Sequence, residues 1–429
     1  MTFERSSHLF FIMSEKKTTF ASLGIKDSIL KVLSKQELIT PTPIQEQAIG
    51  PILEGHDLVG IAQTGTGKTL AFGIPMLERL SSSNGKGLIV VPTRELASQV
   101  SESIKTVGAP FGLKTAVLIG GEYIQKQIFN LRKKPHIVIA TPGRLIDHLK
   151  RKTFSLDNVK MIVLDEADMM FDLGFAPDME EILKQAPVER QTLLFSATMP
   201  SAIAKLSAKY LKLPIRIEVA PQGTTAETVE QEVIILKSSN RFSYLQDILS
   251  KNQGSILVFV RTKRGVSDLN KRLVGLSHSV DEIHSNLSQG RRKKTLDSFR
   301  NGKTRILIAT DVAARGLDIK GIELVVNYNL PDANIDYVHR IGRTGRAGLV
   351  GRAISLATVD QLKNISGIEK IINKKISIKD NHNLIETEKR NLDSKTKAFK
   401  SGRRNKNKHK HRGHNQRGRK VRAKRFSKN

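Results

Sequence analysis

Short apolar runs alternate with stretches of helical periodicity along most of this chain, and this alternation is the feature that most limits its fold. Such runs are typical of strands buried on both faces of a parallel sheet, with the helical stretches covering those faces. The alternation occurs in two series, separated by the polar segment APQGTTAETVE at 220–230. We therefore predict an α/β protein with two parallel-sheet domains in tandem and a ligand in the cleft between them.

The same pattern predicts strand positions and domain boundaries. In the first series, strands are expected near 58–62, 87–91, 115–119, 137–140, 160–164, 192–195 and 215–219. In the second series, they are expected near 233–236, 256–260, 282–284, 305–309, 324–327 and 353–356. The boundaries give an N-terminal extension at 1–19, a first domain at 20–219, a linker at 220–230, a second domain at 231–378 and a basic tail at 379–429. Because residues 1–12 match no element of this fold, Met13 is expected to be the true start.

Composition excludes several classes of protein. The chain has no cysteine, so it can form neither disulfides nor thiolate metal sites. No apolar run approaches the length of a membrane span, and the stretch 9–13 is too short for the core of a signal peptide. We therefore expect a cytoplasmic protein.

Positive charge is the strongest bias of the composition. The formal net charge is +30 and the pI about 10.2, which predicts a polyanionic partner. Residues 390–429 carry 17 Lys or Arg against a single acid, Asp393. Such a dense block of like charge will not fold alone, so we expect a disordered arm that binds nucleic acid. A solubilising tail without a particular ligand is the alternative.

The string MIVLDEAD at 161–168 marks the end of one predicted strand. Asp165 and Glu166 follow the apolar run directly, and Asp168 comes two residues later. The carboxyl end of a parallel strand opens onto the crevice in which such folds bind their ligands. Taken alone, the string fits an acidic turn equally well.

The string AQTGTGKT at 62–69 supplies the second half of a site, because it lies between a strand-like and a helical stretch. Small residues at such a turn let backbone N–H groups surround phosphate oxygens. Lys68 would then reach the β- and γ-phosphates of a nucleoside triphosphate, and the Thr69 hydroxyl would bind Mg²⁺. The general pattern has glycine at the position of Ala62, so a glycine-rich turn with a solvated lysine is the alternative. The predicted loop residues are Ala62, Gln63, Thr64, Gly65, Thr66, Gly67, Lys68 and Thr69.

A triphosphate at this loop would give each nearby carboxylate a role. Asp165 is expected to hold Mg²⁺ together with Thr69, and Glu166 to orient or deprotonate the attacking water. Phosphoryl transfer depends mainly on positioning and charge neutralisation, so a further cation is expected at the γ-phosphate.

The segment YVHRIGRTGRAG at 337–348 is the candidate source of that cation. Arg340, Arg343 and Arg346 recur every three residues among glycines, as in a loop that presents guanidinium groups to phosphate. If these arginines complete the site of the first domain, hydrolysis requires the two domains to close. A basic loop that contacts RNA or only solvent is the alternative.

With these motifs the chain resembles the DEAD-box family of ATP-dependent RNA helicases, over about residues 20–375. The resemblance implies two RecA-like domains, ATP and Mg²⁺ as cofactors, and RNA as partner. PTPIQ at 41–45 resembles the adenine-recognising motif, in which Gln45 would hydrogen-bond the adenine edge and Phe20 would stack on the base.

The resemblance also assigns roles to residues of the second domain. Arg315 would contact the phosphate region of ATP and Asp318 its ribose, whereas Arg343 and Arg346 correspond to the arginine fingers of the family. The catalytic set is then Lys68, Asp165, Glu166, Arg343 and Arg346.

Further motifs resemble those that couple ATP to RNA. Ser196 and Thr198 lie in the string SAT, which would hydrogen-bond Asp168 and link the ATP state to strand separation. Threonine, glycine and arginine at strand ends can bind a sugar–phosphate backbone without reading bases, and can prefer RNA through its 2′-OH. Ser285 stands where the family usually has glycine. The implied RNA contacts are Arg94, Gly121, Thr141, Arg144, Arg261, Gln289, Arg292 and Thr310.

Three functions remain open at this point. The first is an RNA helicase that binds RNA and ATP between its domains, unwinds short duplexes or remodels RNA–protein complexes, and hydrolyses ATP to recycle. The second is an ATP-controlled RNA clamp or annealing chaperone in which unwinding is incidental, and the third is a DNA helicase. We expect a monomer; ribosomal or RNA-turnover assemblies are the expected partners.

Overall fold

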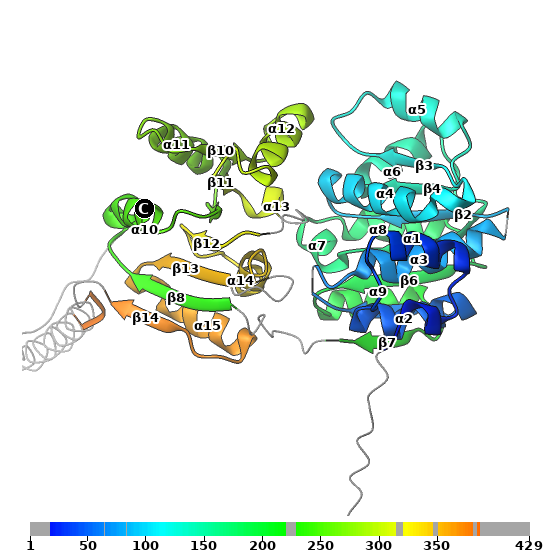
Figure 1. Ribbon diagram of the computed structural model, residues 1–429, viewed down its shortest axis with the longest axis horizontal. Helices are drawn as coiled ribbons and strands as arrows, with labels where there is room; N and C mark the ends of the chain where they lie inside the picture. Colours follow the sequence, from blue (N-terminus) through cyan, green and yellow to red (C-terminus); the bar gives the residue numbers. More distant parts are fainter. Residues whose placement is uncertain are drawn as a thin grey trace, which may run out of the picture.

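The computed structural model describes residues 18–63, 65–82, 84–219, 229–314, 321–345, 351–380 and 384–386. It contains two seven-stranded sheets, one in each domain, and every strand pair in both is parallel (Figure 1). The predicted α/β architecture with two tandem domains is therefore confirmed. In the described part of the chain, no helix is long and apolar enough to cross a membrane.

The first sheet has the strand order β3-β4-β2-β5-β6-β1-β7. Helices α1–α4 pack on one face and α6–α9 on the other, so the central strands are buried on both sides. The strands are β1 (Leu58–Ile61), β2 (Lys86–Val90), β3 (Thr115–Leu118), β4 (Ile137–Ala140), β5 (Val159–Leu164), β6 (Gln191–Ser196) and β7 (Ile215–Glu218). The helices are η1 (Phe20–Leu23), α1 (Asp27–Lys35), α2 (Pro43–Glu54), α3 (Lys68–Ser81), α4 (Arg94–Gly108), η2 (Ala109–Phe111), α5 (Ile124–Arg132), α6 (Pro142–Lys150), α7 (Ala167–Asp172), α8 (Ala176–Gln185) and α9 (Ser201–Tyr210).

The second sheet has the order β10-β11-β9-β12-β13-β8-β14. Helices α10 and α11 cover one face, and α12–α15 cover the other. The strands are β8 (Val229–Ile235), β9 (Ile256–Phe259), β10 (Val280–Ile283), β11 (Ile306–Ala309), β12 (Leu324–Asn327), β13 (Gly351–Ala357) and β14 (Ser377–Asp380). The helices are η3 (Ser238–Asn240), α10 (Arg241–Lys251), α11 (Lys263–Val274), α12 (Gln289–Arg300), α13 (Asp311–Ala314), α14 (Asn334–Ile341), η4 (Val359–Gln361) and α15 (Leu362–Ile372).

The structure corrects the predicted edges of the second domain. Strand β8 begins at Val229, inside the predicted linker, because Val229 is buried and pairs with Gly351. Strand β14 was not predicted, since its side chains are largely exposed and only its pairing with β8 defines it. The domain also extends past residue 378: Leu384 and Ile385 pack against its core, and their backbone N–H groups donate to Asp380.

The strand order of the first sheet brings three predicted motifs together. Strand β6 lies between β5 and β1 in parallel register. The loops that follow these neighbouring strands therefore leave the same edge of the sheet. They carry the phosphate loop, the DEAD string and the SAT string, so this edge is where a site can form.

Candidate functional site

The phosphate loop has the backbone conformation that its glycines permit. Gly65 and Gly67 have φ of 90° and 93°, and Gly67 caps the N-terminus of α3. A Cβ atom at Gly67 would lie 2.3 Å from Gln45 Nε2, so a side chain cannot fit there. The hydroxyl of Thr66 donates to the carbonyl of Gln63 (2.8 Å), which closes the turn. Thr64 lies outside the described residues.

Gln45 connects this loop to helix α2. Its Nε2 donates to the Gly67 carbonyl (3.0 Å), and its Oε1 accepts from the Thr42 backbone N–H (2.9 Å) as half of a capping box. Phe20 is buried in the core of the first domain. These contacts fix Gln45 beside the loop. The roles of Gln45 and Phe20 toward adenine remain predictions.

Lys68 and Glu166 form a buried ion pair across the strand ends. The distance between Lys68 Nζ and Glu166 Oε1 is 2.9 Å, and both side chains are nearly inaccessible. Glu166 has a φ of 54°, a left-handed conformation that is strained for a residue with a side chain. The fold thus holds the carboxylate at the loop despite a backbone cost of about 1–3 kcal/mol.

The pKa values of the adjacent carboxylates Asp165 and Glu166 are shifted in opposite directions. Burial raises the pKa of Asp165 to about 7, although Lys68 acts in the opposite direction. Burial is the largest single effect on Glu166 and would raise its pKa, but the charge and hydrogen bond of Lys68, with smaller contributions from His339 and Arg343, together lower the pKa of Glu166. For Lys68, burial lowers the pKa and the charges of Glu166 and Asp165 raise it, with a net increase. Glu166 is therefore ionised at neutral pH, whereas Asp165 lacks a fully compensating cation.

The predicted contact between the DEAD and SAT strings is present. Asp168 Oδ2 accepts from the backbone N–H (2.8 Å) and the hydroxyl (3.0 Å) of Thr198. The Ser196 hydroxyl accepts from the backbone N–H of Asp168 (3.1 Å). Asp168 is thereby fixed to the loop after β6, next to the ion pair of Lys68.

The three arginines of the second domain are not equivalent. Arg340 is buried inside its own domain, where it forms an ion pair with Asp311 and donates to Asn327 Oδ1 (3.1 Å). Arg343 follows the end of α14, and its positive charge lowers the pKa of Glu166 in the first domain, after the larger effect of Lys68. The electrostatic influence of the second domain thus reaches the ion pair. Arg346 lies outside the described residues.

A second group of predicted residues lines a cavity of about 460 Å³ between the domains. The guanidinium of Arg94 lies over the Gly120–Gly121 turn; a Cβ at Gly121 would be 2.0 Å from Arg94 Nη1. Burial lowers the pKa of Arg94, with a further decrease from the nearby positive charges of Arg292 and Arg144. Residues of the cavity wall include Arg94, Gly120, Thr141, Arg144, Ser285 and Arg292.

A direct ion pair joins the two domains at this cavity. Arg292 Nε of α12 lies 2.7 Å from Glu95 Oε1 of α4, and both side chains are buried. Sequence reasoning assigned Arg292 to RNA and named Glu95 only as a member of the string PTREL at 92–96, which the family resemblance links to RNA. An ion pair between the two residues was not predicted.

The remaining predicted RNA contacts lie at the ends of elements in the second domain. Arg261 follows β9 and donates to the Leu330 carbonyl (3.3 Å). Gln289 is the first residue of α12, and Thr310 directly precedes α13. Arg315 and Asp318 lie outside the described residues.

Gln127 is a site residue that the sequence did not indicate. This buried amide donates to the Ile119 carbonyl (2.8 Å) and accepts from Arg144 Nη1 (3.1 Å). Its Oε1 also lies 3.1 Å from His148 Nε2. Gln127 therefore fixes Arg144 relative to the turn at Gly120. A glutamine within an ordinary helical stretch carries no pattern that reveals this.

Comparison with known proteins agrees with this geometry. Residues 42–206 match the family model described as DEAD/DEAH box helicase, and residues 240–348 match the helicase conserved C-terminal domain. The chain is 43% identical over 368 residues to the ATP-dependent rRNA helicase RRP3 of Yarrowia lipolytica, covering 85% of this chain and 77% of that protein. The chain belongs to the DEAD-box helicase family. The helicase is also 42% identical over 362 residues to the ATP-dependent RNA helicase CshA of Listeria monocytogenes, covering 84% and 70% of the two chains.

Solved structures extend the likeness to both domains of the helicase. Dbp5 of S. cerevisiae, bound to RNA and ADP BeF3, has a TM-score of 0.78 and 30% identity, covering 86% of this chain and 98% of that one. Mss116p bound to ssRNA and AMP-PNP has a TM-score of 0.79 and 29% identity, covering 86% and 80%.

The residues at the first site fit a bound Mg²⁺. Mg²⁺ prefers oxygen ligands and is commonly held by one or two carboxylates together with substrate phosphates. Asp165 is a buried carboxylate at this edge of the sheet, and its burial raises its pKa to about 7, although Lys68 acts in the opposite direction. Among the described residues, no three His, Cys, Asp or Glu side chains form a cluster that could hold a metal ion.

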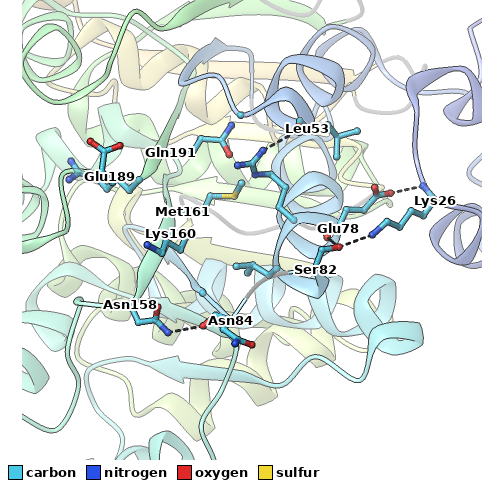
Figure 2. Close-up of a pocket in the computed structure, with 15 residues that line it drawn as sticks. Lys26, Leu53, Glu78, Ser82, Asn84, Asn158, Lys160, Met161, Glu189 and Gln191 are labelled. Carbon is cyan, nitrogen blue, oxygen red and sulfur yellow. Dashed lines mark hydrogen bonds between the residues drawn. The ribbon is translucent and has the colours of Figure 1, made fainter.

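A separate cavity of about 780 Å³ lies at the opposite edge of the first sheet, where β1, β2, β5 and β6 begin (Figure 2). Lys26 donates to Glu78 through its backbone N–H (2.6 Å) and to Ser82 through Nζ (3.1 Å). Asn158 donates to the Asn84 carbonyl (2.7 Å). These side chains bind one another, and neither Lys68 nor Asp165 is among the residues of the wall, so this cavity is not the nucleotide site.

Proposed function

We propose that this chain is an ATP-dependent RNA helicase whose hydrolytic site is divided between its two domains. The observation that carries the proposal is the electrostatics of Glu166. Its carboxylate is held by Lys68 of the first domain, and its pKa is lowered further by His339 and Arg343 of the second. A site that depends on both domains ties hydrolysis to their closure.

Each residue then has a defined task. Lys68 would exchange its partner Glu166 for the β- and γ-phosphates of ATP, which frees the Glu166 carboxylate to orient the attacking water. Arg343 would neutralise charge that develops on the γ-phosphate. Mg²⁺, held by Asp165 and Thr69, would supply positive charge at the phosphate oxygens. Gln45 would recognise the base of the bound nucleotide. Its side-chain amide already connects the phosphate loop to the start of α2.

RNA would bind along the interdomain cavity and promote closure. Arg94, Thr141 and Arg144 line it from the first domain and Arg292 from the second. These donors suit phosphate and ribose oxygens, so binding would be largely independent of sequence. The pair of Glu95 with Arg292 supports a closed arrangement in which one continuous strand contacts both domains. Bending of that strand would separate a short duplex or displace a bound protein.

Replacing Glu166 by glutamine tests this assignment. We expect Glu166→Gln to abolish ATP turnover while ATP and RNA still bind, because the substitution removes the water-orienting charge and keeps the shape. Glu189→Gln, at an exposed carboxylate far from the phosphate loop, is the matched control and should hydrolyse ATP normally. Retained turnover in Glu166→Gln would contradict the role of this residue.

Two further comparisons separate the helicase from its alternatives. ATP hydrolysis should be stimulated by RNA more than by DNA of the same length; stronger stimulation by DNA would favour a DNA helicase. A labelled RNA strand should be released from a short duplex when ATP is added. Retention of RNA in the presence of ATP without strand release would instead indicate an RNA clamp.

A further inference from the structure

Helix α5 of the first domain has an unusual surface. It stands at the upper margin of this domain in Figure 1, and its single buried side chain is the polar Gln127. Tyr123 at its N-terminus is 89% exposed and Phe129 on the helix is 59% exposed. Within the part of the chain that the structure describes, these are the only two exposed aromatic side chains. An exposed ring requires a reason, since burial of an aromatic side chain is favourable.

The charge around the two rings is mainly positive. Lys126, Arg132, Lys133 and Lys134 are all exposed, and Glu122 is the single acid between residues 121 and 136. Lys133 Nζ lies 4.5 Å from the centre of the Phe129 ring, so cation and aromatic face are adjacent. Exposed rings interleaved with cations provide both contacts that single-stranded nucleic acid needs: stacking for bases and positive charge for phosphates.

The helix is joined rigidly to the interdomain cavity. Arg144, which lines the cavity, donates to the Glu122 carbonyl at the start of α5 (3.1 Å). Gln127 connects the middle of the helix to Ile119, next to the cavity residue Gly120. Arg144 and Gln127 therefore connect α5 directly to the wall of the cavity.

We propose that the α5 surface, formed by Tyr123, Lys126, Phe129, Arg132, Lys133 and Lys134, binds single-stranded RNA where the strand leaves the interdomain cavity. The proposal rests on the proposed RNA-binding function of that cavity and extends it. Bases stack on Tyr123 and Phe129, and the four cations contact the phosphates. The surface lengthens the RNA footprint and holds the flanking strand while the cavity acts on its own segment. An acidic protein partner is the competing occupant, and it would leave RNA affinity unchanged.

Affinity measured against RNA length tests the proposal. Full-length protein with an ATP analogue is titrated with oligouridylates of increasing length, by fluorescence anisotropy. We expect Tyr123→Ala/Phe129→Ala to bind the shortest RNAs, which fill only the cavity, as the wild type does. Longer RNAs should bind about fivefold more weakly for each ring that is removed from beneath a base. Tyr123→Phe retains the ring and should behave like the wild type.

Charge is tested by a second pair of variants. Lys126→Gln/Lys133→Gln should lower the slope of log affinity against log salt by about 1.4 on long RNA, at about 0.7 for each phosphate that the variant no longer neutralises. Lys184→Gln/Lys205→Gln, at two exposed lysines of α8 and α9, removes the same charge elsewhere and should leave the slope unchanged.

The outcomes distinguish a failure of the α5 proposal from a failure of the proposed RNA-binding function. If the variants bind long RNA like the wild type while short RNA binds normally, the α5 surface is not an RNA contact and this proposal is overturned alone. If the wild-type chain binds no RNA in the presence of the ATP analogue, the proposed function fails first, and the α5 surface fails with it.

Discussion

Substitution of Arg340 tests whether this arginine of the second domain stabilises the fold or binds phosphate. Its guanidinium is 1% exposed and lies within its own domain. It pairs with Asp311 through Nη2 (2.8 Å), and Nη1 donates to Asn327 Oδ1 (3.1 Å) and the Asn329 carbonyl (2.6 Å). With its donors already engaged, Arg340 is structural, and Arg340→Met should weaken folding instead of removing a phosphate ligand.

The magnitude follows from the burial of the pair. Removing one partner of a buried ion pair costs about 3–5 kcal/mol, because the other charge is left without compensation. The Asp311 side chain is 22% exposed, so water offsets part of this loss and about 3 kcal/mol is expected. For a domain that spans residues 229–380, each kcal/mol lowers the melting temperature by about 2–4 °C. The unfolding transition of the second domain should therefore fall by about 6–12 °C.

Calorimetry of the full-length chain measures this shift. Arg352→Met is the matched control, because Arg352 pairs with Glu232 at 3.3 Å but its side chain is 44% exposed. An exposed pair contributes about 0–1 kcal/mol, so the control should shift the transition by about 4 °C or less. If Arg340→Met moved the transition no further than the control, the guanidinium would not be part of the core. Arg340 would then return to the candidates for phosphate binding.

Two other predictions concern Arg343, the proposed arginine finger, and the buried His148. Arg343→Ala should lower the RNA-stimulated rate of ATP hydrolysis by about 10³–10⁵ if Arg343 acts as an arginine finger, and a loss of tenfold or less would reduce it to an RNA contact. His148 should make the stability of the first domain depend on pH: burial, with a smaller contribution from Arg144, lowers its pKa from 6.5, so the folded state keeps it neutral. The free energy of unfolding should be highest above about pH 6.5 and fall as the pH drops further, since the unfolded chain then gains a proton that the folded chain resists. Denaturation of His148→Asn across this range should show a weaker dependence, and an identical profile would contradict the assignment.

The sequence was most informative where chemistry requires a fixed local pattern. The glycines around Lys68 predicted a phosphate loop, and Gly67 indeed adopts a φ of 93° in contact with Gln45. The apolar run before Asp165 predicted strand β5, because a strand buried on both faces must be apolar throughout. The contact of Asp168 with the SAT string was also foreseen through the family resemblance.

The surroundings of each side chain, by contrast, could not be deduced from the spacing of residues in the sequence. Arg340 and Arg343 are only three residues apart in the same arginine-rich string, yet α14 ends between them at Ile341. Arg340 is therefore directed into the core toward Asp311, while the charge of Arg343 acts on Glu166. Strand β14 escaped prediction for a related reason, since its exposed side chains give no apolar pattern and its pairing with β8 is a long-range event.

The sequence by itself determined most strands of this protein and the groups that are proposed to react, because apolar periodicity and glycine-rich turns act over a few neighbouring residues. Tertiary structure alone decided which groups meet. It paired Lys68 with Glu166, joined Glu95 to Arg292 across the domains, and made Gln127 the link between α5 and Arg144. Burial sets the pKa of each carboxylate and the partner of each cation, and burial is a property of the whole packed chain.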